Sequence, residues 1–489
     1  MKATLEIKDE VNVKIHGLSR ETRIALVKKF KFILPYARHT PAFKLGRWDG
    51  TVAFFQMGGS TYINLLPEIL PIIIDQGYDV ELNDTRDYRI DYAFQHVDAN
   101  TFDYMTWPVG HPHEDKPIVL RDHQVETING FYDDTQSIQE VATGAGKTII
   151  TAILSMMCQD YGRTIIVVPN RSLVTQTEED YINIGLDVGV IFGGRKEYGH
   201  QHTICTWQSL DNMVKAEKKA KDPDKMTMSE FMDNGDEIVA IIVDEAHGAK
   251  AEVLKQMMQG PFAKVPIRWG LTGTVPKEVF DRNALVCSIG HVTNEVTAKS
   301  LQDKGILANC HVNILQYLDW VLYNSYPAEM KFLSGDIARL EQISRQIISI
   351  NESGNTLLLV NHIKTGKLLE EMIPNSVFLS GATKNDARKL EYDKIKEVDN
   401  RVIIATYGIA AVGINIPRIF NLCLHEPGKS FIKVIQSIGR GLRVASDKDH
   451  VEIWDFTSNC KFAKRHLTQR KKFYRDAQYP FTITKVERD

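Results

Sequence analysis

The sequence lacks the features that mark secreted, zinc-bound and membrane proteins. Its six cysteines are scattered and form no C-x-x-C pair, which argues against a zinc site and favours reduced thiols in a protein core. No apolar run approaches the length needed to cross a bilayer, and the charged and apolar N-terminus lacks the hydrophobic stretch of a secretory signal. We therefore expect a cytoplasmic protein with no membrane partner.

An excess of either charge is also missing. The formal net charge is −3, from 59 basic and 62 acidic residues. This balance neither favours nor excludes nucleic acid, because a protein that follows a phosphate backbone needs local positive grooves rather than a basic total. One local candidate is the basic segment 461–475, for which a solvated helix is the alternative. Besides Lys461, its cations are Lys464, Arg465, Arg470, Lys471, Lys472 and Arg475.

Several domains are expected, because 489 residues exceed what one hydrophobic core usually serves. Apolar strand-like runs alternate with amphipathic helical stretches, which predicts an α/β fold with mostly parallel sheets covered by helices on both faces. Two such blocks are expected, at 118–293 and 320–489, with a connector at 294–319. A small α/β unit is expected at 1–93, followed by a linker at 94–117.

The blocks are defined by their expected strands, and the polar stretch at about 212–236 interrupts the first block as an insertion with some helix. In the first block the expected strands are Arg163 to Val168, Thr203 to Thr206, Ile238 to Val243 and Arg268 to Leu271. In the second they are Asn355 to Val360, Val377 to Leu379, Arg401 to Ala405, Phe420 to His425 and Val451 to Phe456.

A glycine-rich heptad, Ala142 to Thr148, follows a short strand-like stretch and opens an apolar helical run. Its glycines let backbone N–H groups turn toward phosphates, Lys147 supplies a charge to the β- and γ-phosphate oxygens, and the Thr148 hydroxyl completes a Mg²⁺ shell. The general pattern has a glycine where Val141 stands, so a glycine-rich turn is the alternative. The expected ligands of ATP and Mg²⁺ are Thr143, Gly144, Ala145, Gly146, Lys147 and Thr148.

A second group of polar residues follows the all-apolar run Ile238 to Val243. A phosphoryl-transfer site needs a carboxylate for Mg²⁺ and a group that orients the attacking water, and ligands of parallel sheets bind beyond the carboxyl ends of the strands. We therefore expect Asp244 to hold the metal and Glu245 to activate water. For His247 we expect a hydrogen bond to the turn at 271–274 rather than metal binding.

Near the C-terminus, Arg440 and Arg443 stand three residues apart, and on a helix they would share one face. A guanidinium group is well suited to stabilise the charge of a transferring phosphoryl group. If the second block supplies these arginines, hydrolysis requires the two blocks to close, as in a motor.

Taken together, these residues resemble the motifs of superfamily two helicases and translocases, in the expected order over about residues 115–460. The resemblance implies two tandem RecA-like motor domains that hydrolyse ATP with Mg²⁺ and move along nucleic acid. The matching motifs are Leu120 to Gln124, Ala142 to Thr148, Asp244 to His247, Leu271 to Thr274, Ile404 to Pro417 and Gln436 to Arg443.

The same resemblance assigns roles to single residues. It implies that Arg121 and Gln124 read adenine, that Gly413 lies at the nucleotide, and that Arg443 is the arginine finger beside Arg440. It also implies that three residues contact the nucleic-acid backbone: Arg171, Thr206 and Thr406. Asn415 stands where the family commonly has aspartate, so a ribose or coupling contact there would lose its charge.

The N-terminal segment Phe43 to Gly50, with Ile63 to Pro67, is similar to the N-terminal domain of bacteriophage recombination helicases of the UvsW type. This narrower resemblance implies an enzyme of recombination, repair and replication that acts on branched DNA by branch migration, fork regression and short-duplex unwinding, in the host cytoplasm if a phage encodes it. A monomer is expected. Single-strand-binding or recombination proteins are expected partners. The segment places a cation beside Trp48, which either stacks on bases or packs in the domain.

Other functions remain open. An RNA helicase is one, since the motor motifs contact mainly phosphates. A restriction-type translocase is another, but its nuclease candidate, Glu217 to Lys219, lies in the polar insertion rather than on a strand. A catalytically silent DNA clamp would not need Lys147, Asp244, Glu245 and both arginines together.

Overall fold

The part of the chain that the structure describes forms two compact units. The computed structural model describes residues 1–34, 36–86, 92–108, 113–219, 226–248, 251–276, 278–383, 390–392, 394–395, 398–410, 418–428 and 448–488. One unit holds Met1–Val141 and Lys147–Glu295, and the other holds Ala142–Gly146 and Val296–Asp489. Within the described ranges no helix is both long and apolar enough to span a bilayer. All six cysteines are buried and free, which confirms that they are core thiols.

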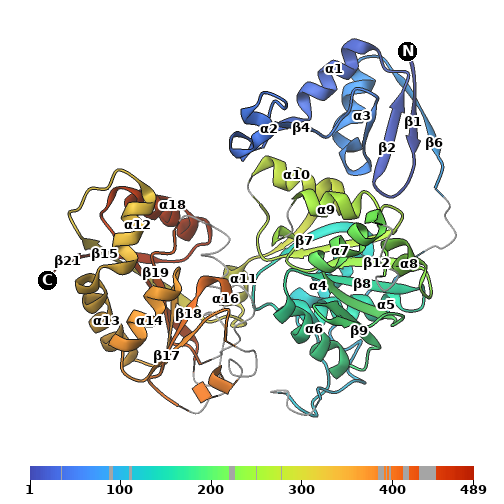
Figure 1. The fold of residues 1–489 in the computed structure, drawn as a ribbon. Helices are drawn as coiled ribbons and strands as arrows, with labels where there is room; N and C mark the ends of the chain where they lie inside the picture. The colour runs from blue at the N-terminus through green and yellow to red at the C-terminus, as the bar shows by residue number, and fades with distance from the viewer. Residues whose placement is uncertain are drawn as a thin grey trace. The chain divides into compact units, whose positions relative to one another are not determined.

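The first unit begins with a four-stranded sheet in the order β5-β2-β1-β6 (Figure 1). Strand β1 pairs antiparallel with β2 and parallel with β6. Burial alternates along β1, and its inward side chains pack against helix α3. The elements are β1 (Lys2–Ile7), β2 (Asn12–His16), α1 (Arg20–Lys29), β3 (Lys31–Ile33), η1 (Ala37–His39), α2 (Pro41–Lys44), β4 (Thr51–Ala53), β5 (Ser60–Tyr62), η2 (Ile63–Leu65), α3 (Leu66–Asp75) and β6 (Asp79–Asp84).

The rest of the first unit is built on an eight-stranded sheet in the order β10-β9-β11-β8-β12-β13-β7-β14. Side chains alternate between its two faces: Ile166 of β8 packs with α4, α5 and α6, whereas Ile165 packs with α7 to α10. Its elements are α4 (Asp122–Asp133), β7 (Gln136–Val141), α5 (Lys147–Cys158), β8 (Arg163–Val168), α6 (Arg171–Asn183), β9 (Val188–Phe192), β10 (Arg195–Lys196), β11 (His202–Thr206), α7 (Trp207–Lys219), α8 (Met228–Asp233), β12 (Ile238–Val243), η3 (Ala246–Gly248), α9 (Ala251–Met258), β13 (Ile267–Thr272), α10 (Val279–Ser288) and β14 (His291–Val296).

The N-terminal sheet shares its hydrophobic core with helix α10 of the larger sheet. Phe280, Ala284 and Cys287 are buried among the apolar side chains of β1, β2 and α3. The rings of Phe54 and Phe280 lie 5.8 Å apart, and the Lys255 ammonium of α9 lies 4.6 Å from the Phe54 ring centroid. The N-terminal sheet therefore packs on α9 and α10, the helices that follow β12 and β13 along the chain.

The second unit contains a seven-stranded sheet in the order β17-β18-β16-β19-β20-β15-β21. Every pairing in it is parallel, so the carboxyl ends of all its strands meet at one edge. Helices α13 and α14 cover one face. The elements are α11 (Ala298–Asp303), β15 (Asn309–Leu318), α12 (Tyr326–Gly335), α13 (Ile337–Asn351), β16 (Thr356–Val360), α14 (Ile363–Met372), β17 (Ser376–Leu379), β18 (Val402–Thr406), α16 (Tyr407–Ala410), β19 (Asn421–His425), β20 (His450–Ser458), α18 (Lys461–Asp476) and β21 (Phe481–Glu487).

Two segments differ from the sequence prediction. The stretch expected as a linker packs into the core instead: Val97 and Phe102 are 5% and 3% exposed. The expected connector contains β15, an interior strand whose polar residues alternate with buried ones. The polar insertion contains helix, as predicted: α8 lies within it, and its Met228 and Phe231 are buried against α7.

Candidate nucleotide-binding site

The predicted phosphate loop joins β7 to helix α5. Gly144 and Gly146 have φ angles of 91° and 85°, a conformation that costs glycine little and other residues more. Helix α5 begins at Lys147, directly after the loop. The first N–H groups of a helix have no partner within it, and the helix dipole favours an anion at that end. The local geometry is therefore that of a phosphate-binding turn.

Lys147 is paired inside this site. Its Nζ lies 2.7 Å from Oε1 of Glu245 and 3.5 Å from the Val141 carbonyl oxygen. The two charged side chains are only 10% and 15% exposed. A phosphate that binds Lys147 must therefore displace the Glu245 carboxylate. The carboxylate thus occupies the place that a negatively charged phosphate would take beside Lys147.

Asp244 and Glu245 follow β12, whose six residues are all buried. The Asp244 N–H donates to the Val167 carbonyl oxygen at 2.9 Å, and the Glu245 N–H donates to Oδ1 of Asp244 at 2.8 Å. Burial, together with the neighbouring Glu245 charge, raises the pKa of Asp244 despite the attraction of Lys147. A dication would relieve this cost, so Asp244 suits Mg²⁺, and the half-buried Thr148 in the first turn of α5 suits it as a hydroxyl ligand.

Glu245 is the centre of a hydrogen-bonded group. Its Oε2 accepts from the Gly273 N–H at 3.3 Å and lies 3.5 Å from Nδ1 of His247. Nδ1 of His247 also lies 2.7 Å from Oγ1 of Thr272, which confirms the predicted link between His247 and the turn after β13. Burial opposes ionisation of Glu245, but the charges of Lys147 and His247 and the hydrogen bonds outweigh it, so its pKa is lowered.

The backbone at Glu245 has a φ of 49°. This left-handed conformation is uncommon for residues other than glycine, and such strain often occurs at functional sites. The amino-acid pattern did not predict this conformation. It also did not predict the direct pairing of Glu245 with Lys147, because 98 residues separate the two.

The residues expected at adenine lie at the start of α4. Gln124 is 6% exposed, and its Oε1 accepts a hydrogen bond from the Arg121 N–H at 2.9 Å. The Gln124 side chain thus holds the N-terminus of α4, while the Arg121 side chain is exposed. Their contact with a base stays a prediction.

The expected backbone contacts lie at carboxyl ends of strands. Arg171 is exposed at the start of α6, just after β8, and Thr206 ends the neighbouring strand β11. Oγ1 of Thr206 accepts from the Ser209 N–H at 3.3 Å, so this hydroxyl also caps α7. Thr406 is half-buried at the end of β18 in the second unit.

Several predicted residues lie outside the described part of the chain. They are Gly413, Asn415, Arg440 and Arg443, and their roles remain predictions.

The basic segment near the C-terminus forms helix α18. The prediction that all its cations form a surface patch is wrong for one of them, Arg470. Arg470 is 1% exposed and pairs with the Asp455 carboxylate at 2.8 and 3.0 Å, while it also donates to the Gly428 carbonyl oxygen at 2.8 Å. The helix is amphipathic, and position 470 falls on its buried face. Lys464, Arg465, Lys472 and Arg475 are exposed, and Lys471 is half-buried.

The carboxyl edge of the second sheet carries a further charged network. Arg339 donates to Glu426 at 2.7 Å and to Asp319 at 3.3 Å, and all three side chains are at most 3% exposed. Ser458 Oγ donates to the same Asp319 oxygen at 2.6 Å. One cation faces two carboxylates here: burial raises the pKa of Glu426 to about 7, and Oδ1 of Asp319 is buried without a hydrogen-bond partner.

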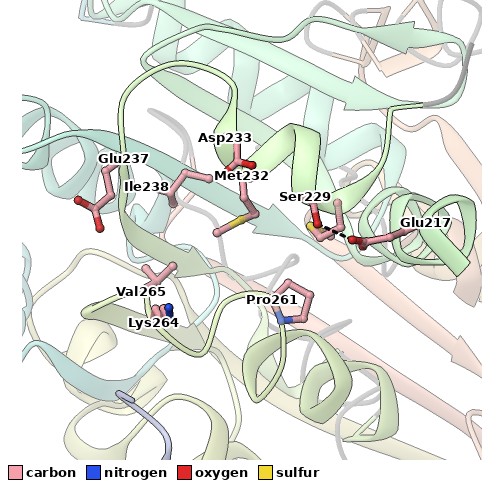
Figure 2. Close-up of a pocket in the computed structure, with 10 residues that line it drawn as sticks. Glu217, Ser229, Met232, Asp233, Glu237, Ile238, Pro261, Lys264 and Val265 are labelled. Atoms are coloured by element: carbon pink, nitrogen blue, oxygen red, sulfur yellow. Dashed lines mark hydrogen bonds between the residues drawn. The ribbon is translucent and has the colours of Figure 1, made fainter. Parts of the chain in front are cut away.

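A separate cavity of about 500 Å³ lies beside Ile238, the first residue of β12 (Figure 2). Asp244 follows the opposite end of this strand, so the cavity is distinct from the phosphate loop. Carboxylates on its wall would repel a triphosphate. They belong to Glu217, Asp233 and Glu237.

Comparisons with known proteins show similarity to helicases. Residues 117–277 match the family model described as the type III restriction enzyme res subunit, and residues 338–445 match the helicase conserved C-terminal domain. The chain is 22% identical over 470 residues to the ATP-dependent DNA helicase UvsW of enterobacteria phage T4, with 91% of this chain and 88% of that protein covered.

Two further proteins resemble the chain, one in sequence and one in fold. A putative DNA 3'-5' helicase Rad25 of Haloarcula marismortui is 23% identical over 340 residues, covering 67% of this chain and 51% of its own length. Among solved structures, a putative HsdR subunit fragment of a type I restriction enzyme from Vibrio vulnificus gives a TM-score of 0.56 at 14% identity, with 98% and 85% of the chains covered. This structural likeness concerns the fold alone.

Proposed function

The chain belongs to the superfamily two helicases, with two RecA-like domains, and from this premise we propose that it uses ATP hydrolysis to remodel branched DNA. The similarity to an ATP-dependent DNA helicase supports DNA as the nucleic acid. The proposed reactions are branch migration, regression of replication forks and unwinding of short duplexes. The observation that carries the catalytic part is the Lys147–Glu245 pair beside the buried Asp244.

The pair suggests how ATP binding prepares hydrolysis. When the phosphates of ATP draw Lys147 away, Glu245 loses its main counter-charge. The pKa of the Glu245 carboxyl then rises, and the group becomes a better proton acceptor for the attacking water. Mg²⁺, held by Asp244 and Thr148, would neutralise charge on the phosphates. Water activation is thereby tied to the presence of ATP.

The proposed DNA-recognition role of the N-terminal segment is supported by its charge. Between Ser19 and Gly50 the only acidic residues are Glu21 and Asp49, and Asp49 is paired with Lys31 at 2.6 Å. The exposed cations of this segment are Arg20, Lys28, Lys29, Lys31, Arg38, Lys44 and Arg47. Such a concentration favours phosphate binding in a chain whose total charge is slightly negative.

The segment Phe43 to Gly50 supports phosphate contacts rather than base stacking by its tryptophan. Trp48 is half-buried in the N-terminal core, and its Nε1 donates to the Thr51 carbonyl oxygen at 2.9 Å. Lys44 and Arg47 are exposed on the same segment. The cations are therefore free to meet DNA while the tryptophan holds the segment in place.

The test compares nucleic-acid-stimulated ATP hydrolysis on linear DNA, Holliday junctions, fork mimics and duplex RNA of equal length. We expect branched DNA to stimulate turnover at lower concentrations than linear DNA. Stimulation by duplex RNA alone would contradict the DNA assignment and favour the RNA helicase. Equal stimulation by branched and linear DNA would remove the junction preference but leave a DNA translocase.

A double variant, Lys44→Ala with Arg47→Ala, tests the N-terminal role. We expect its preference for forks to fall several-fold. The slope of log affinity against log salt concentration should become shallower by the amount that about two phosphate contacts contribute. A control with Lys218→Ala and Lys304→Ala removes two exposed charges elsewhere. These substitutions are preferable to deleting residues 1–93, because deletion would uncover the apolar side chains of α10 that complete the N-terminal core.

A further inference from the structure

A loop joins β15 to α12 (Figure 1). It exposes two large apolar side chains. Trp320 is 78% exposed and Leu322 is 79% exposed. Val321 and Tyr323 are half-buried: Val321 packs against the buried cluster of Leu333, Cys460 and Ala463, and the Tyr323 ring lies 5.5 Å from that of Phe332. Exposed and half-buried side chains thus alternate from Trp320 to Tyr323.

The backbone of this loop is held in place. The N–H groups of Asp319 and Trp320 both donate to Oδ1 of Asn459, at 3.0 and 3.3 Å. The Val321 carbonyl oxygen accepts from the Cys460 thiol at 3.4 Å. Trp320 has a φ of 51°, a strained value for a bulky residue. A ring kept exposed on a strained and anchored backbone indicates a function in binding.

Positive charge lies on α18, which is held next to the loop. The Cys460 thiol, just before α18, donates to the Val321 carbonyl oxygen, and Glu329 of α12 accepts from the N–H groups of Phe462 and Ala463 at 2.7 to 3.0 Å. The exposed cations on this part of α18 are Lys461, Lys464 and Arg465. Neither 320–328 nor 461–475 contains an acidic residue, and Glu329 itself is 1% exposed.

The position of the loop fits a nucleic-acid path. Because all strands of the second sheet are parallel, the loop after β15 lies at the same edge as Thr406 after β18. Four strand spacings separate β18 from β15 in the sheet order, or about 19 Å. A strand of a few nucleotides that contacts Thr406 can therefore reach Trp320.

We propose that Trp320 and Leu322 form a platform on which unpaired bases of the bound strand stack, while Lys464 and Arg465 contact its phosphates. Aromatic rings bind bases of any sequence, and cations beside them bind the backbone, which is how single strands are held without sequence preference. The platform rests on the proposed function, because it requires a nucleic-acid strand at this edge. It gives the motor a contact with bases in addition to its phosphate contacts.

The test uses fluorescence anisotropy to measure the affinity of the protein for an oligothymidylate and for an abasic oligonucleotide of the same length. Loss of one stacked base weakens binding about five- to a hundredfold. We expect Trp320→Ala to reduce affinity for the oligothymidylate by such a factor while affinity for the abasic strand stays nearly constant. Trp320→Phe should retain most of the difference in affinity between the oligothymidylate and the abasic strand. Leu322→Ala should show a smaller loss, and Ile348→Ala, at an exposed apolar residue of α13, should show none.

The phosphate part has its own variant. Lys464→Ala with Arg465→Ala should weaken both strands about equally and lower the salt dependence. Circular dichroism confirms that each variant is folded. If Trp320→Ala and Leu322→Ala bind both strands as the parent does, the platform is wrong while the helicase function stands. If the parent protein binds no single strand, both fail; if only RNA strands show the Trp320 effect, the platform stands and the DNA assignment fails.

Discussion

The carboxyl edges of the two parallel sheets carry charged groups of the same kinds in different surroundings. At the first edge Lys147 and Glu245 retain 10% and 15% exposure and pair with each other. At the second edge Arg339 and Glu426 retain 0% and 3%, and Arg339 also binds Asp319. The first pair can exchange a partner for a phosphate, whereas the second is enclosed by its own chain.

This difference shows that topology alone does not make a site. Both sheets place charges beyond the ends of their strands, where ligands of parallel sheets bind. Reactivity needs, in addition, a charge whose present partner can be replaced. The buried pairs of the second unit are costly to break, because a single unpaired charge would remain in an apolar environment. Substitutions should therefore affect turnover at the first edge and local stability at the second.

The largest effect is expected from Lys147→Ala. The variant loses the phosphate charge and leaves Glu245 without its counter-ion, so ATP turnover should fall about a thousandfold or more, or roughly 4 kcal/mol. Steady-state ATP hydrolysis with saturating DNA measures it, and DNA binding serves as the control for folding. Turnover within tenfold of the parent would show that Lys147 does not act on the phosphates.

Arg470→Met tests a buried charged pair of the second unit. Breaking its pair with Asp455 leaves a buried carboxylate, and we expect the local opening free energy of α18 and β20 to fall by about 3 kcal/mol. Hydrogen exchange of these two elements reports the change. Adding Asp455→Asn should restore part of the protection, since the uncompensated charge is then gone. Unchanged protection in the single variant would mean that the pair is exposed to water in solution.

Glu245→Gln sharpens the contrast at the first edge. The amide keeps the size of the side chain but cannot accept the proton of the attacking water, so turnover should fall about a hundredfold while ATP binding persists. Equilibrium binding of ATP and single-turnover hydrolysis separate the two steps. Rapid hydrolysis in this variant would remove Glu245 from its assigned role.

A smaller effect applies to both units. Burial lowers the pKa of His202, at the start of β11, from 6.5 to about 4, and lowers that of His425, at the end of β19, to about 3. The unfolded chain takes up protons below pH 6.5 that the folded chain does not accept. Stability is therefore full above pH 6.5 and falls as the pH decreases, by roughly 2 kcal/mol for His202 at pH 5.

Urea unfolding between pH 7 and pH 5 measures this dependence. His202→Gln should flatten it in the first unit, whereas His39→Gln, at an exposed histidine, should not change it. A pH dependence that is the same in both variants would show that His202 is not kept neutral by burial.

The fold was predictable where strands are buried on both faces. The continuous apolar runs Arg163–Val168 and Ile238–Val243 are β8 and β12 with the predicted bounds. The strands β15 and β21 were missed, because polar residues alternate along them and their pairing with distant strands sets their structure. Two RecA-like domains in an α/β fold are confirmed.

The site was predictable as a set of residue types but not as a set of pairings. Spacing identified Lys147, Asp244 and Glu245, and the link from His247 to the turn after β13. It did not reveal that Lys147 binds Glu245, since such contacts depend on the three-dimensional arrangement of separate strands. For the same reason Arg470 looked like a surface cation, although its place on the inner face of α18 buries it.

Because Phe280, Ala284 and Cys287 of α10 complete the N-terminal core, the first 86 residues cannot be exchanged as a cassette. A chimera that joins them to another motor must retain these three side chains. Otherwise both halves will expose apolar surface and aggregate. Gene fusions that cut the chain near residue 93 are thus disfavoured, and this segment and its motor have to diversify together.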